Sequence, residues 1–201
     1  MKRFNFILVL LVLFSSCSDV KSDNRCKILM GTLFKNFDSS KLEKVEYPNE
    51  GLIEITDKMN KRGERGIFKF DKNKVLRLYA FLINKNLDAI FTIEYDSLGN
   101  QITSTGSDVV QWYIRPLNED TISLTFLLCR LNYSYDKIIV EAKKYKKNTP
   151  LFESAFAGLV GSTINIPTKG VEKIYVSGLK QNKCSKEIKS FKDSTYMLPL
   201  K

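Results

Sequence analysis

Alternation of apolar and polar side chains is the feature that most constrains how this chain folds. Four segments show it, with apolar residues at every second position: 66–71, 89–95, 121–128 and 137–142. Successive side chains of a strand point to opposite faces, so each segment offers one face to a core and one to solvent. The pattern predicts an all-β, mainly antiparallel fold, either a sandwich or a curved meander, with one short helix.

Two segments depart from simple alternation. Residues 78–83 are apolar at consecutive positions, which predicts a strand covered on both faces. In the segment 109–115, Trp112 shares its face with Val110 and Ile114, so we expect Trp112 in the core and Tyr113 as the exposed ring.

The helix has two candidate positions. Thr149-Pro150 has the form of a helix start, and apolar residues follow at helical spacing over 151–160, although a strand through 152–156 fits almost as well. Residues 27–37 also carry an apolar stripe at helical spacing. For the whole chain we expect one β-rich domain over 26–201, with two small β units meeting near 116–120 as the alternative.

Composition removes several classes of enzyme. The chain of 201 residues has no histidine, so Ser-His and Cys-His nucleophile pairs are absent and the commonest zinc ligand is missing. No phosphate-binding loop or EF-hand loop is present, and we expect no catalytic residue, metal or cofactor. The alternative is a carbohydrate-active hydrolase that uses carboxylates, for which Glu94 and Asp96 on one strand and its turn are the best pair.

The N-terminus has the layout of a secretory signal peptide. A short cationic start, Met1-Lys2-Arg3, precedes an apolar run over 6–14, and small residues precede Cys17. The segment Leu13-Phe14-Ser15-Ser16-Cys17 resembles the lipobox of bacterial lipoproteins, with Phe14 where that family usually has Leu. The resemblance implies that residues 1–16 are removed, that Cys17 carries the lipid, and that 17–25 form a tether.

The position after the cysteine bears on location. Enteric lipoproteins held at the inner membrane have Asp there, and this chain has Ser18. The resemblance therefore implies a lipid-anchored protein of the outer membrane in a bacterial cell envelope.

Two predicted hairpins, 68–75 and 93–102, share an aromatic residue, an aspartate, a turn residue and a return to apolar strand. They are similar to the tyrosine-aspartate repeats of large extracytoplasmic β shells. The likeness covers about 35 residues in two units, which are too few for a shell, and hairpin geometry alone favours the same residues.

Three further cysteines remain. Cys129 lies in the apolar run 125–131, where a thiol behaves as a small core residue. Cys26 and Cys184 lie in polar surroundings, and an oxidising compartment favours pairing of exposed thiols. We expect a disulfide between Cys26 and Cys184, and a buried free thiol at Cys129.

The chain is basic, with a formal net charge of +10. The densest cluster, Lys143, Lys144, Lys146 and Lys147, is either a functional patch that lies toward anionic headgroups or a solvated strand end. We expect the membrane, through the lipid anchor, together with envelope proteins or surface glycans as partners, and no nucleic acid. These features favour a binding or structural module at the cell surface or periplasmic face.

Overall fold

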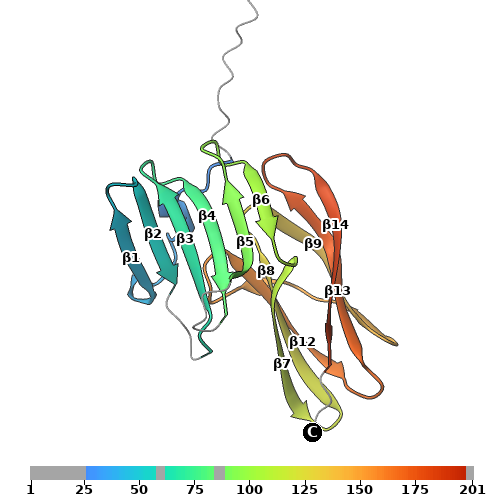
Figure 1. Ribbon diagram of the computed structural model, residues 1–201. Coiled ribbons are helices and arrows are strands. Elements are labelled where there is room, and N and C mark those ends of the chain that lie inside the picture. The colour runs from blue at the N-terminus through green and yellow to red at the C-terminus, as the bar shows by residue number, and fades with distance from the viewer. Residues whose placement is uncertain (1–25, 58–61, 84–88, 198–201) are drawn as a thin grey trace, which may run out of the picture.

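The computed structural model describes residues 26–57, 62–83 and 89–197, and this part of the chain is folded into three antiparallel sheets (Figure 1). The first is a six-stranded meander sheet in the order β1-β2-β3-β4-β5-β6. Its strands are β1 (Leu42–Tyr47), β2 (Leu52–Asp57), β3 (Arg65–Asp71), β4 (Leu76–Leu82), β5 (Ala89–Tyr95) and β6 (Gln101–Thr105). The predicted all-β, antiparallel class is confirmed.

The other two sheets form a sandwich. The central sheet has the order β11-β12-β8-β7 and the outer sheet the order β10-β9-β13-β14. Central-sheet strands are β7 (Val109–Asn118), β8 (Thr121–Cys129), β11 (Phe152–Glu153) and β12 (Leu159–Pro167). Outer-sheet strands are β9 (Tyr133–Ala142), β10 (Tyr145–Asn148), β13 (Lys173–Asn182) and β14 (Ile188–Tyr196).

Two hydrophobic cores lie on opposite sides of the central sheet. One fills the sandwich and includes alternate residues of β8, among them Leu124 and Phe126, packed against Val140 and Val176 of the outer sheet. The other lies between the meander sheet and the central sheet, where Phe81 of β4 meets Phe156 edge to face with ring centroids 5.1 Å apart. The central sheet therefore contributes side chains to both cores, one from each of its faces.

The burial pattern of β8 reflects the packing of the central sheet on both faces. Residues Thr121–Phe126 alternate between half-buried and buried, whereas Leu127, Leu128 and Cys129 are all buried. Leu128 faces the outer sheet, and Leu127 and Cys129 face the meander sheet. Burial thus becomes continuous where a second layer covers the strand.

Aspartates fix two hairpins of the meander. The Asp71 carboxylate accepts hydrogen bonds from the backbone N–H groups of Asn73 (2.9 Å) and Val75 (3.1 Å). The Asp96 carboxylate does the same for Leu98 and Asn100, both at 2.8 Å. This local bonding is why short polar residues are favoured in such turns.

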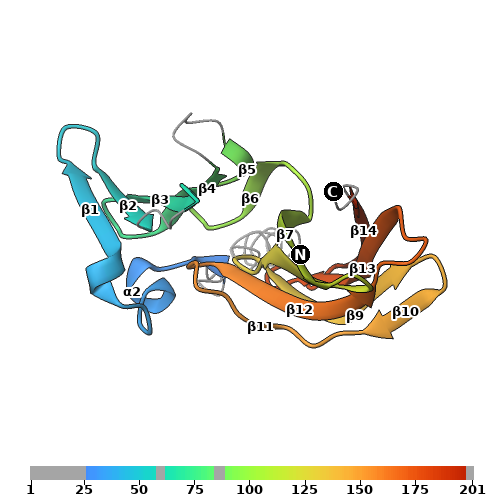
Figure 2. The same cartoon turned by 90° about the horizontal axis from the view of Figure 1, so that it is seen from below.

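The N-terminal segment closes the open edge of the meander core. It contains the short helix α2 (Met30–Leu33) and a 3-10 turn η2 (Ser39–Lys41), and Phe34 packs edge to face on Phe68 with centroids 5.1 Å apart. Seen from below, this segment lies between the meander sheet and β11 (Figure 2). Within the described residues, no helix is long and apolar enough to cross a bilayer.

One sequence prediction is wrong in position. The helix predicted over 151–160 is replaced by β11 and the start of β12, so that the strand alternative was closer, and the short helix lies within 27–37 instead. Residues 116–120 form the end of β7 and its turn into β8, inside the sandwich, and the chain passes from meander to sandwich at 106–108.

Candidate functional site

Pockets of differing charge balance open on the surface of the described residues. One of about 480 Å³ lies between α2 and β11, and one of about 180 Å³ between β6 and the β13–β14 hairpin. In the first, Arg130 is paired with Glu153; in the second, Lys189 is paired with Glu187 at 3.1 Å. Charged side chains in both pockets therefore have partners of opposite charge.

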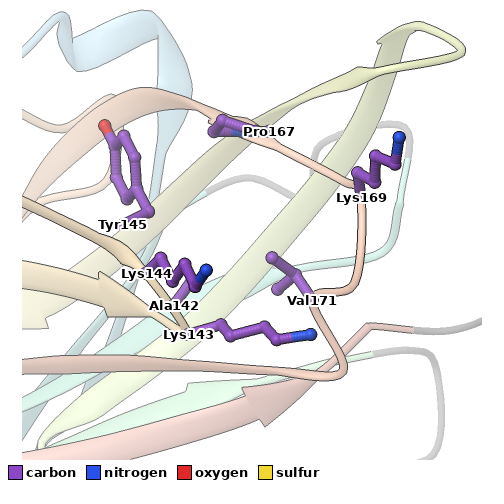
Figure 3. Close-up of a pocket in the computed structure, with 7 residues that line it drawn as sticks. All are labelled: Ala142, Lys143, Lys144, Tyr145, Pro167, Lys169 and Val171. Atoms are coloured by element: carbon purple, nitrogen blue, oxygen red, sulfur yellow. The ribbon is translucent and has the colours of Figure 1, made fainter.

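The third pocket has about 390 Å³ and lies at one end of the sandwich, where the β9–β10 hairpin faces the turn after β12. We call it the lysine pocket. Its wall is formed by Ala142, Lys143, Lys144, Tyr145, Pro167, Lys169 and Val171. Lys143 and Lys144 extend from the hairpin toward Val171, and Lys169 stands on the opposite rim (Figure 3).

The lysine pocket has no acidic wall residue. In the part of the chain that the structure describes, none of the ammonium groups of Lys143, Lys144 and Lys169 has a carboxylate within 4.0 Å. Three unneutralised cations around one concave surface give a positive potential that attracts anions. The volume falls in the range of about 300–1,000 Å³ that small-molecule sites occupy.

The hairpin holds Lys143 in an unusual backbone conformation. Ala142 and Tyr145 are paired across the strands, so Lys143 and Lys144 form a two-residue loop. Lys143 has φ of 51°, in the left-handed region where glycine or asparagine is usually found. A β-carbon built on Gly170 would lie 2.8 Å from Lys143 Nζ, so this ammonium group reaches across to the opposite turn.

Tyr145 forms the floor between the two sheets. Its hydroxyl donates to the backbone carbonyl of Asn165 at 3.3 Å, and its ring packs against the sandwich core. Burial raises the pKa of this phenol, so Tyr145 is a neutral wall residue rather than a source of charge.

The structure separates the four predicted patch residues. Lys143 and Lys144 line the pocket, whereas Lys146 and Lys147 lie on β10 and are exposed. Lys146 is paired with Glu141 across the β9–β10 ladder. Lys169 was not predicted, because the turn after β12 lies 25 residues from the hairpin in sequence and reaches it only through the sandwich.

The remaining predicted residues have mixed outcomes. Cys129 is 2% exposed, and burial raises its thiol pKa to about 12. Cys26 and Cys184 are both half-buried in the structure, and the disulfide between them stays a prediction. Cys17 lies outside the described residues.

Glu94 and Asp96, the carboxylate pair of the alternative hydrolase, have different surroundings in the structure. Both carboxylate oxygens of Asp96 accept hydrogen bonds within its own turn. The backbone N–H of Asn100 donates to one oxygen, and the side-chain amide of Asn100 donates to the other at 3.0 Å. That side-chain bond, together with backbone N–H donors, lowers the pKa of Asp96. Glu94 is an exposed residue of β5.

Tyr113 is not the exposed ring that the sequence predicts. Its hydroxyl donates to Glu64 Oε2 at 2.8 Å, and Gln111 donates to Glu64 Oε1 at 2.9 Å. Glu64 is 2% exposed, and Arg62 lies 4.8 Å above the Tyr113 ring. This buried cluster joins the meander to β7 and is a structural contact between the two units.

No cluster of three or more Cys, Asp or Glu side chains able to hold a metal ion occurs within the described residues. No protein-family model matches the chain, and no curated protein and no solved structure matches it.

Proposed function

We propose that this protein is a lipid-anchored binding module of the bacterial cell envelope, and that its lysine pocket binds an anionic group. The observation that carries the binding part is the gathering of Lys143, Lys144 and Lys169 around about 390 Å³ with no carboxylate among the wall residues. The lipobox-like segment ending at Cys17 supports the anchor, and Ser18 supports the outer membrane.

The strain at Lys143 supports a role for its side chain. A lysine in the left-handed region costs about 1–2 kcal/mol relative to ordinary backbone, and glycine would avoid that cost. Residues held in such conformations gather at functional sites. A lysine that reaches across a pocket from a strained position fits selection for its charge.

The binding test uses the full chain carrying Cys17→Ser, titrated with sodium phosphate and followed by NMR. Phosphate should shift the backbone signals of 143–144 and 168–171. Lys143→Gly should weaken binding about fivefold, because an exposed ion pair contributes up to about 1 kcal/mol. The same variant should be as stable as its parent or more so, since the turn is relieved.

Lys74→Gly is the matched control. Lys74 has φ of 61° and lies in the β3–β4 turn of the meander, so this change removes one positive charge and relieves one strained lysine far from the pocket. Equal loss of phosphate binding in both variants would mean that net charge, and not the lysine pocket, attracts the anion.

The anchor has its own test. Replacing Cys17 with Ser should abolish incorporation of labelled fatty acid and move the protein from the membrane fraction to the soluble fraction. If the variant remains in the membrane fraction after a high-salt wash, the lipoprotein proposal is wrong, whatever the result of the phosphate titration.

A further inference from the structure

A ladder of lysines and tyrosines runs over the exposed face of the outer sheet. It consists of Tyr196, Lys173, Tyr175 and Lys192, on β13 and β14. Ile174 and Val176 point into the sandwich core, so Tyr175 and its neighbours two residues away point outward.

Ring and ammonium groups alternate along the ladder. Lys173 Nζ lies 4.7 Å from the Tyr196 ring centroid and 5.3 Å from that of Tyr175. Lys192 Nζ lies 4.4 Å from the Tyr175 ring centroid. Tyr196 is 68% exposed, so a large aromatic surface is held open to solvent by neighbours that fix its orientation.

The ladder begins beside the lysine pocket, at the same end of the outer sheet. Lys173 follows the pocket residue Val171 by two positions, and Tyr175 is paired with Glu141, which lies one residue before the pocket residue Ala142. Lys146 is paired with the same Glu141 from the other side. Strands are about 4.8 Å apart, so Lys146 and Tyr175 are separated by only about 10 Å across the sheet face.

Carboxylates lie within and beside this surface: Glu141 is paired with Tyr175, and Glu172 is exposed between Val171 and Lys173. Glu141 lies 4.0 Å from Lys192, at the limit of an ion pair. The cations of the pocket and the ladder outnumber these carboxylates, so the combined surface stays positive. Its units, a cation beside the exposed ring of Tyr196 and cations beside the half-buried ring of Tyr175, match a ligand that repeats an acidic group beside an apolar ring face.

The surface also lies at the end of the molecule away from the anchor. β13 starts next to the pocket and rises about 3.3 Å per residue, so its ten residues span about 30 Å. The last residue of β13, Asn182, lines a pocket together with Gln101 of β6. Gln101 lies two residues after Gly99, and the carbonyl of Cys26 packs on Gly99. Cys26, where the described chain begins, therefore lies at the end of β13 away from the lysine pocket (Figure 1).

The tether cannot readily reverse that arrangement. Eight residues, 18–25, extend at most about 28 Å, which is no more than the length of β13. The headgroups of the anchoring membrane are therefore a poor fit for the pocket, contrary to the orientation that the basic cluster suggested from sequence. An anionic polymer in the space beyond the membrane fits better.

We infer that the lysine pocket and the Tyr-Lys ladder form one extended site for an acidic polysaccharide held away from the anchoring membrane. Acidic groups of the polymer pair with the lysines, and apolar faces of its sugar rings lie on Tyr196 and Tyr175. This inference rests on the proposed function for the pocket half of the site and adds the ladder half.

The test measures binding of the full Cys17→Ser chain to polygalacturonate, with neutral dextran and vesicles containing anionic phospholipid as parallel probes. Polygalacturonate should bind, and affinity should fall as salt rises. Tyr196→Thr keeps a strand-forming residue at an exposed position and should weaken polygalacturonate binding about 3- to 10-fold. It should leave phosphate binding in the pocket unchanged.

Tyr47→Thr is the control, because Tyr47 is a 40% exposed ring on β1 of the meander. If Tyr196→Thr and Tyr47→Thr bind polygalacturonate as well as the parent while phosphate still binds, the extended site is wrong and the pocket proposal stands. If the parent itself bound neither phosphate nor polygalacturonate, the proposal that the lysine pocket binds an anion would be wrong as well. Tighter binding to anionic vesicles than to polygalacturonate would overturn the orientation.

Discussion

The two buried tyrosines of the meander core give a sharp test of how polar groups affect stability here. Tyr79 is fully buried, and its ring packs on Phe68 with centroids 4.7 Å apart. Its hydroxyl, like that of Tyr95, has no hydrogen-bond partner among the described residues. Burial raises the pKa of Tyr79 far above its ordinary value, so the group remains a neutral phenol.

A buried polar group without a partner costs about 1–3 kcal/mol, whereas a satisfied one stabilises by about 0.5–1.5 kcal/mol. Tyr79→Phe should therefore raise the free energy of unfolding by about 1 kcal/mol, after allowance for the small void left by the oxygen. Tyr135→Phe should lower it by about 1 kcal/mol, because the Tyr135 hydroxyl donates to the Cys129 carbonyl at 2.6 Å.

Urea unfolding of the two variants, followed by circular dichroism, measures this difference in sign. The corresponding shift in Tm is about 2–4 °C per kcal/mol for a domain of this size. If Tyr79→Phe lost as much stability as Tyr135→Phe, the Tyr79 hydroxyl would have to be bonded in solution, for example to a buried water, and the reasoning from its missing protein partner would fail.

Three further predictions concern other parts of the fold. Gly99→Ala should destabilise more than Gly51→Ala in urea unfolding. Both glycines have positive φ, but only at Gly99 would the new methyl group lie 2.6 Å from the Cys26 carbonyl oxygen. Burial raises the pKa of Asp57 in the folded protein. The buried charge therefore lowers the free energy of unfolding at pH values above the folded-state pKa, and this loss vanishes below the unfolded-state pKa of about 4. Asp57→Asn should therefore be more stable than the parent at pH 7, with the difference shrinking as pH falls toward 4; a constant difference would contradict this. Cys129 should resist thiol reagents in the native protein and react after denaturation, since its thiol is buried with a pKa of about 12, and labelling at the native-state rate of an exposed thiol would show that the core opens.

The sequence predicts the β strands well because their signal is local. β8 is the clearest case, since polar residues occupy alternate positions up to Thr125 and then give way to Leu127, Leu128 and Cys129. That change marks the point at which the meander sheet covers the second face. β5 was likewise predicted with its observed bounds, Ala89–Tyr95.

The helix predicted after Pro150 fails because a long-range contact outweighs a local pattern. Thr149, the expected helix cap, is buried and its hydroxyl bonds to that of Ser162 on β12. Its backbone N–H donates to the Ile138 carbonyl at 3.0 Å, which continues the β9–β10 ladder. Apolar residues that follow Pro150 at helical spacing are therefore divided between β11, a loop and β12.

The lysine pocket could be predicted only in part. The basic cluster marks Lys143 and Lys144, but neither the backbone strain of Lys143 nor the neighbour Lys169 has a local signature. Tyr113 is a similar case, because the carboxylate that buries it, Glu64, lies 49 residues earlier in the chain. Side chains that meet across different sheets become visible only when the sheets are placed.

The layering also bears on where the proposed binding surface lies. Cores on both sides of the central sheet leave the meander face, the outer-sheet face and the ends open to solvent. Some charges on the meander are paired with each other, as in Lys69 with Glu54 at 3.4 Å and Arg77 with Asp71 at 3.6 Å. Three lysines that have no carboxylate partner among the described residues line the pocket at the end of the sandwich opposite Cys26. If the proposed anchor at Cys17 and the proposed anion site are both correct, they lie at opposite ends of the protein, so the site would face a ligand beyond the anchoring bilayer.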